Sequence, residues 1–99
     1  MTTWLRLGEI QIGGGDDDAA ERHDLRVSVG SIDLGGSGSN ANATASIDGV
    51  PNALRLRLLK ESIGAACTIY RGAVAIYSGT VDVIRGNVGS RVLGLELQS

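Results

Sequence analysis

Alternating apolar and polar residues, interrupted at short intervals by glycine, are the feature that most restricts how this chain can fold. The run 54–58 is Leu-Arg-Leu-Arg-Leu. As a strand it would bury its leucines on one face and expose Arg55 and Arg57 on the other. Comparable runs occupy 3–12, 23–34, 41–48, 66–70, 73–77, which continues at 80–85 after an interruption at Gly79, and 91–97. The pattern predicts an all-β fold, a small antiparallel barrel or sandwich of about seven strands.

The breaks between these runs are typical of turns and loops. Arg71-Gly72 separates two strand-like runs, and a two-residue connection with glycine indicates a β-hairpin. Gly30 shifts the phase of the alternation, so that Ile32 and Leu34 continue it, and Gly8 predicts a bulge or bend. Two glycine-rich or acidic stretches, near 13–22 and 35–41, predict flexible loops. Only 58–64 suggests a single helical turn. The 99 residues are enough for one domain, spanning 1–99.

The core must be built from aliphatic side chains, because the chain has no Phe, one Trp and two Tyr. The single cysteine, Cys67, excludes an internal disulfide and fits a reducing compartment. No run is long and apolar enough for a signal peptide or a membrane span. We therefore expect synthesis and folding in the cytoplasm.

Charge is divided unevenly along the chain. Residues 1–49 carry a balance of −5 and residues 50–99 a balance of +3, which together make the net charge of −2. One molecule can thus offer an acidic part to the basic part of a neighbour, as a head-to-tail contact requires. A net negative charge argues against a dedicated nucleic-acid-binding protein.

Residues with catalytic or metal-binding chemistry are sparse. Cys67 lies in an apolar run and is interpreted as a core residue, and His23 follows the acidic loop with no nucleophile nearby. Asp16, Asp17 and Asp18 are consecutive, whereas a calcium loop alternates its ligands. The sequence therefore predicts no enzyme, no cofactor and no metal. A metal-assisted enzyme or accessory subunit working through the acidic loop is kept as a distant alternative.

A basic surface is the basis of the main alternative. Arg55, Arg57, Lys60, Arg71 and Arg85 could share one face of a barrel, which would suit a free-standing β-barrel that binds nucleic acid or oligosaccharide. Such a site also needs exposed aromatic side chains for stacking. Only Trp4, Tyr70 and Tyr77 are available, and at least some of them are expected in the core.

The run 64–85 resembles a pattern in phage tail and baseplate hub proteins. There a strand ending in Tyr-x-Gly turns into a second strand, and an aromatic-x-Gly-x-Val segment leads to the next; Tyr70-Arg71-Gly72 and Tyr77-Ser78-Gly79-Thr80-Val81 match it. The resemblance covers about half the chain and uses common hairpin residues. Hub domains usually lie within longer chains, and the glycine-rich and aspartate-rich loops match no motif of the family.

The resemblance implies a small β-barrel in a symmetric ring near the tail tip, without catalytic residues. We accordingly expect a structural protein of the virion, in the phage tail or baseplate, that contacts other tail proteins and copies of itself as a homo-oligomer. Neither a membrane nor nucleic acid is an expected partner. The candidate interface residues are Asp16, Asp17, Asp18, Arg55, Arg57 and Arg71.

Overall fold

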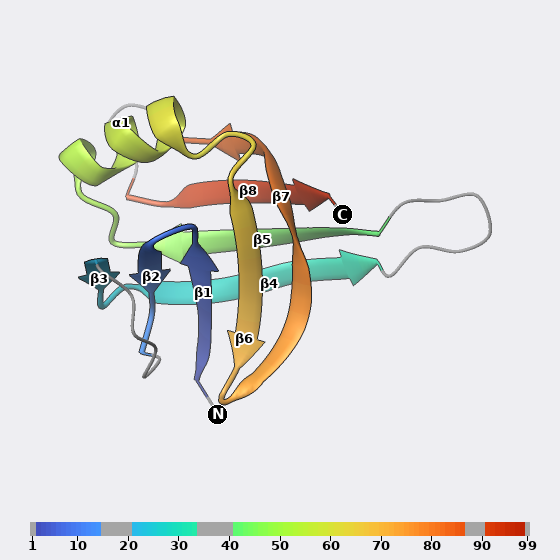
Figure 1. The fold of residues 1–99 in the computed structure, drawn as a ribbon. Coiled ribbons are helices and arrows are strands. Elements are labelled where there is room, and N and C mark those ends of the chain that lie inside the picture. The colour runs from blue at the N-terminus through green and yellow to red at the C-terminus, as the bar shows by residue number, and fades with distance from the viewer. Residues whose placement is uncertain (1, 15–20, 34–40, 87–90, 99) are drawn as a thin grey trace.

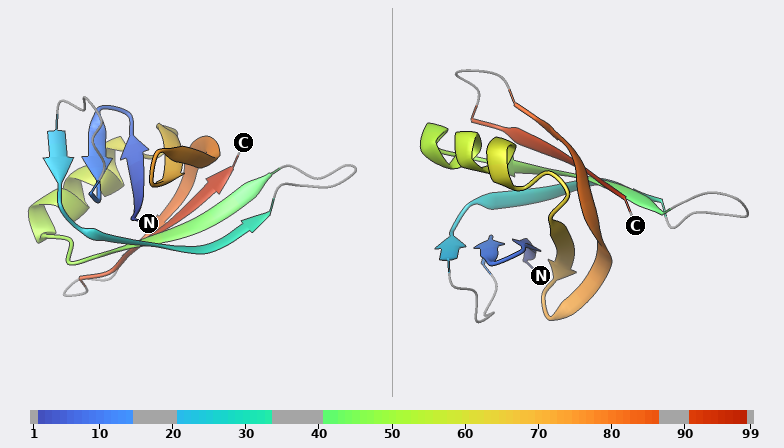
Figure 2. Two further views of the ribbon diagram at one scale, coloured as in Figure 1. Left: turned by 90° about the horizontal axis from the view of Figure 1, so that it is seen from below. Right: turned by 45° about the horizontal axis from the view of Figure 1, so that its top comes forward.

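The computed structural model describes residues 2–14, 21–33, 41–86 and 91–98. These residues form one mixed sheet of eight strands in the order β3-β2-β1-β6-β7-β8-β5-β4, with a single short helix. The predicted all-β class is confirmed. The sheet is strongly bent but not closed, so that its two halves cross in front of one another with the core between them (Figures 1 and 2). No helix among the described residues is long and apolar enough to cross a membrane.

The N-terminal strands make the front half in Figure 1. β1 (Thr3–Leu7) pairs antiparallel with both β2 (Ile10–Ile12) and β6 (Ala66–Arg71), while β3 (Glu21–His23) runs parallel to β2. The predicted run 3–12 is therefore two strands. Gly8, with φ +57°, lies in the tight turn between them, a backbone region that glycine occupies at little cost.

The back half contains β4 (Arg26–Asp33), β5 (Asn42–Asp48) and β8 (Leu93–Gln98), paired antiparallel. The register of β4 on β5 shifts between Val29 and Ser31, so the phase shift predicted at Gly30 is confirmed and takes the form of a bulge. β7 (Val74–Arg85) is long enough to belong to both halves, pairing with β6 at its start and β8 at its end. Gly79 lies within this continuous strand and does not end it.

The strand predicted at 54–58 is wrong: α1 (Asn52–Glu61) occupies these residues. Alanine, leucine, arginine, lysine and glutamate are strong helix formers, and no residue of the segment is β-branched. Pro51 precedes the first turn, where its missing N–H costs nothing. Leu54 and Leu58, one helical turn apart, face the core, whereas Leu56 between them is exposed, so burial follows the period of a helix and not the Leu-Arg alternation.

The core fills the space between the halves of the sheet and beneath α1. Its buried side chains are Leu5, Leu7, Ile12, Val27, Ala43, Ala45, Ile47, Val50, Leu54, Leu58, Cys67, Ile69, Tyr77, Val81, Ile84, Leu93, Leu95 and Leu97. Almost all are aliphatic, as the composition predicted. Trp4 is also buried, where its ring stacks on Tyr70 with centroids 4.1 Å apart and its indole N–H donates to the Gly72 carbonyl.

Candidate functional site

The most concentrated group of charged side chains joins the edge strand β3 to the helix. Glu21 and His23 are two residues apart on β3 and so lie on one face of the strand. His23 Nε2 is 2.5 Å from Glu21 Oε2. β3 is only three residues long and pairs with β2 on one side only, so few backbone hydrogen bonds hold it in place. Side-chain contacts of Glu21 and His23 therefore add to what fixes its position.

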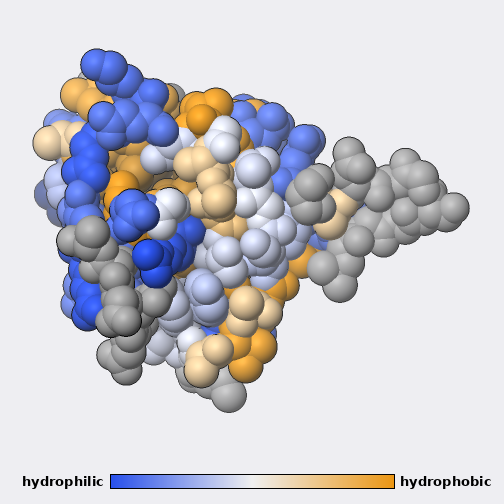
Figure 3. Space-filling model, viewed as in Figure 1, coloured by the Kyte–Doolittle hydropathy of each residue, from blue (hydrophilic) through white to orange (hydrophobic). Residues whose placement is uncertain are grey.

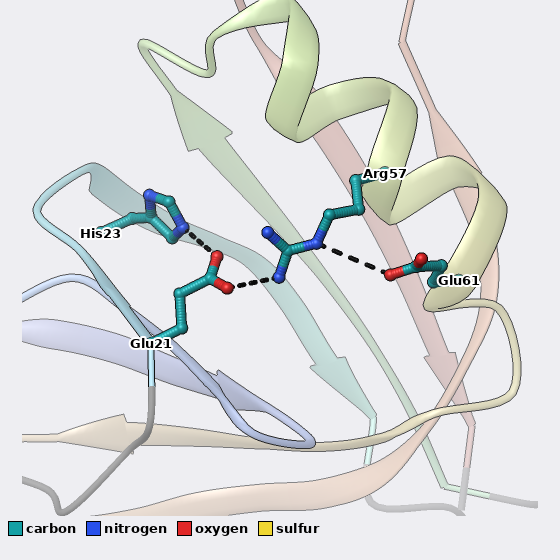
Figure 4. A network of polar contacts seen from close by, with 4 residues as sticks. All are labelled: Glu21, His23, Arg57 and Glu61. Atoms are coloured by element: carbon teal, nitrogen blue, oxygen red, sulfur yellow. Dashed lines mark hydrogen bonds and ion pairs between the residues drawn. The ribbon is translucent and has the colours of Figure 1, made fainter.

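The helix supplies the other two members of this group. Arg57 and Glu61 are four residues apart, on one face of α1. Arg57 Nη2 lies 2.5 Å from Glu21 Oε1, and Arg57 Nε lies 3.6 Å from Glu61 Oε2 (Figure 4). The chain His23–Glu21–Arg57–Glu61 thus connects a strand and a helix that are 36 residues apart at the Glu21–Arg57 contact. We call these residues the β3–α1 network.

The charges of the network stabilise one another. The hydrogen bond from Arg57, followed by that from His23, holds the pKa of the Glu21 carboxyl below its ordinary value. The same Glu21 contact raises the pKa of the Arg57 guanidinium. Since the side chains of Glu21 and Arg57 remain 32% and 42% exposed, water screens these interactions and each is worth little to stability.

A histidine paired with a carboxylate can act as a general base, but it needs a group to activate. The thiol of Cys67 does not supply one, because it is buried in the core and burial raises its pKa to about 12. Cys67 is a core residue, as predicted. Among the described residues no three His, Cys, Asp or Glu side chains are placed to hold a metal ion. What the geometry shows is that the β3–α1 network links the strand to the helix.

The structure scatters the predicted interface residues. Asp16, Asp17 and Asp18 lie outside the described residues. Arg55 was predicted to point outward but is buried, because it lies on the inner side of α1 next to Leu54. Arg57 is exposed yet engaged in the β3–α1 network, and Arg71 is exposed at the far end of β6, opposite Thr3 of β1. In Figure 1 that end of β6 lies at the bottom and α1 at the top.

The same positions weaken the alternative of an oligonucleotide-binding face. Trp4 and Tyr77 are buried, and one side of the Tyr70 ring is covered by Trp4. Arg57 and Arg85 pair with carboxylates, the latter with Glu96 at 2.9 Å. Among the described residues, two of the three aromatic rings that could stack on bases are thus buried, and two of the predicted cations are paired with carboxylates.

Exposed apolar side chains are a more informative feature of the surface. Leu56 (62% exposed) lies on α1 and Ile63 (51%) follows it, while Val74 (64%) begins β7 and Val92 (47%) precedes β8. In Figure 3 hydrophobic surface gathers at the β6–β7 turn, at the bottom of the view, whereas the side of β3 is strongly hydrophilic. The sequence pattern did not indicate that Leu56 is exposed, because a strand at 54–58 would bury it, and Ile63 belonged to no predicted strand.

The open sheet itself leaves two edges. β3 forms one and β4 the other, and among the described residues neither has a second neighbouring strand. β3 is short, whereas β4 has eight residues. Unpaired N–H and C=O groups along an edge of that length can pair with a strand from another chain.

Comparison with known proteins adds no assignment. No known protein family, no curated protein and no solved structure matches this chain.

Proposed function

We propose that the chain is a structural protein that assembles through protein–protein contacts, including contacts with copies of itself, as a component of a phage tail or baseplate. The observation that carries the assembly role is the open sheet, whose long edge strand β4 has a described neighbour on one side only. The exposed side chains of Leu56, Ile63 and Val74 add apolar surface of the kind that protein interfaces cover.

The assignment to a phage tail is supported by the sequence resemblance in 64–85. The residues that carry it, Tyr70-Arg71-Gly72 and Tyr77-Ser78-Gly79, lie in the β6–β7 hairpin. Gly72 has φ +61° in the two-residue turn, and its N–H donates to the Thr2 carbonyl. In this proposal the protein is made in the host cytoplasm and ends in the tail of the virion.

The decisive experiment measures assembly directly. The purified full chain is examined by sedimentation velocity over a wide concentration range, and it is co-expressed with the proteins encoded beside its gene and isolated with them. We expect self-association and a complex with at least one tail protein. A chain that stays monomeric and joins no neighbour would overturn the proposal. Binding of an oligonucleotide at low salt, weakened by Arg71→Ala, would instead support the nucleic-acid alternative.

A further inference from the structure

The free edge of β4 runs along one side of the back half of the sheet. In the left view of Figure 2 this edge faces the viewer, with β5 behind it. A hollow of about 640 Å³ lies at the start of β4, between residues 24–27 and the N-terminal residues Thr2, Thr3 and Gly14. No described strand pairs with this edge of β4, so its backbone groups can accept an additional strand.

The sequence of β4 is complementary to itself. It reads Arg-Val-Ser-Val-Gly-Ser-Ile-Asp from Arg26 to Asp33, with opposite charges at its two ends. If a second copy of β4 is laid antiparallel along the first, Arg26 faces Asp33 of the second copy. Val27 then faces Ile32 of that copy, and Ser28 faces its Ser31. Each of these pairs joins side chains of the same kind or of opposite charge.

The bulge at Gly30 makes this register possible. In a regular antiparallel pair, opposite residues point to the same face. A two-fold axis between two identical strands must therefore lie midway between one residue and its own copy, whereas the register above, counted by residue number, is centred between Val29 and Gly30. Because Gly30 is the extra residue between Val29 and Ser31, the axis passes between the two copies of Val29. Arg26, Ser28, Ser31 and Asp33 are all exposed, which places their pairs together on the outer face.

The inner face gains apolar contact in the same arrangement. Val29 and Ile32 are only half-buried and pack at the margin of the core. In the paired arrangement their counterparts from the second copy would lie beside them across the two-fold axis, so that the two cores become continuous. From the charge complementarity, the matching faces and the edge position of β4, we infer that the chain forms a two-fold dimer by antiparallel pairing of β4 with β4 of a second copy. The inference rests on the proposed function in one respect: it assigns a surface to the contact between copies that the proposed function includes.

A charge swap tests the register. Arg26→Asp places two carboxylates opposite each other in the dimer, and Asp33→Arg places two guanidiniums there. Because the Arg26–Asp33 pair occurs twice in a two-fold dimer, either single change removes both pairs. We therefore expect each change to raise the dimer Kd about tenfold. The double variant R26D/D33R should restore the wild-type Kd. Arg91→Asp reverses an exposed charge away from this edge and serves as the matched control.

The double variant also removes an ambiguity within the fold. Arg26 lies opposite Asp48 on β5 of its own chain, so R26D alone also affects the monomer. That intramolecular repulsion persists in R26D/D33R. Recovery of the dimer in the double variant is therefore specific to the contact with the second copy. Thermal unfolding of each variant confirms that the fold is retained.

Crosslinking gives a second, independent measurement. Val29→Cys places two thiols across the proposed axis, at a spacing that a disulfide can bridge, and buried Cys67 does not compete. Oxidation should convert the V29C protein to a covalent dimer, whereas Ser78→Cys, in the middle of the sheet on β7, should give no covalent dimer on a denaturing gel.

The outcomes separate this inference from the proposed function. A wild-type chain that is monomeric at its highest soluble concentration would overturn the dimer. Self-association that R26D and D33R leave unchanged would refute pairing through β4 but leave the structural role standing. If R26D/D33R restores the wild-type dimer Kd but the chain forms no complex with tail proteins, the result would support the dimer and count against the phage-tail assignment.

Discussion

Replacing Gly79 with alanine should destabilise the protein through a clash with the neighbouring strand. A Cβ atom at Gly79 would lie 2.4 Å from the Gln98 carbonyl oxygen and 2.9 Å from its carbon, where ordinary contact begins at 3.4 Å. These are backbone atoms of β8, so they cannot turn aside as a side chain would. β7 and β8 would have to separate by about 1 Å at this end, which costs about 1–3 kcal/mol of unfolding free energy.

Gly94→Ala is the matched control, because Gly94 also lies in a paired strand of the same sheet. Its new Cβ would meet nothing closer than 3.7 Å, and neither glycine has a positive φ. Alanine suits a strand interior better than glycine, so G94A should be neutral or more stable by up to about 1 kcal/mol. Urea denaturation at equal m-values measures both changes. If G79A and G94A unfold at the same urea concentration, the clash does not explain the glycine at position 79 of the aromatic-x-Gly-x-Val segment.

Three further predictions follow from burial and charge. Leu58→Ala should cost about 2–5 kcal/mol of unfolding free energy, because Leu58 is fully buried. Leu56→Ala should cost less than about 0.5 kcal/mol; equal losses would contradict the helix, since a strand buries both on one face. The pKa of Glu21 is lowered from 4.5, so its contribution to stability is present at neutral pH and is lost as pH falls below that value. Glu21→Gln should flatten this acid dependence in denaturation curves; a variant as acid-sensitive as the wild type would count against the β3–α1 network. Cys67, whose pKa is raised to about 12 by burial, should resist a thiol-specific reagent in the folded protein and react after unfolding. Rapid labelling of the folded protein would show that the core opens there.

Local signals allowed much of the sheet to be predicted. The β6–β7 hairpin depends on Gly72, which adopts the positive φ of a two-residue turn, and the bulge depends on the phase shift at Gly30. Such features involve neighbouring residues only. They can therefore be recognised without knowing how the strands are ordered in the sheet.

The helix was missed because period-two alternation was given more weight than intrinsic propensity. Leu54, Leu56 and Leu58 satisfy a strand pattern, yet the absence of β-branched residues in 52–61 and the preceding Pro51 indicated a helix. Which leucines are buried is decided by how the segment packs on the core. The exposed position of Leu56 therefore could not be derived from the alternation.

The β3–α1 network shows a different limit. Glu21 and His23 share one face because β3 is a strand. The acidic residues that precede them in the sequence indicated a loop instead. Their contact with Arg57 is set by the docking of α1 against the sheet edge. No sequence spacing encodes that distance. The open edge of β4 likewise depends on the order of all eight strands.

The position of β8 has a consequence for how the protein is made. This last strand lies inside the sheet, between β7 and β5, so it joins residues 42–48 to residues 80–85. On the ribosome, the β6–β7 hairpin and α1 can form early from nearby residues, but β4 and β5 stay detached from them until residues 93–98 have emerged from the exit tunnel. Folding then waits for contacts between distant parts of the chain, which places it among the slower small domains, in milliseconds to seconds. A truncation that removes β8 would leave two separate pieces of sheet with both halves of the core open to water.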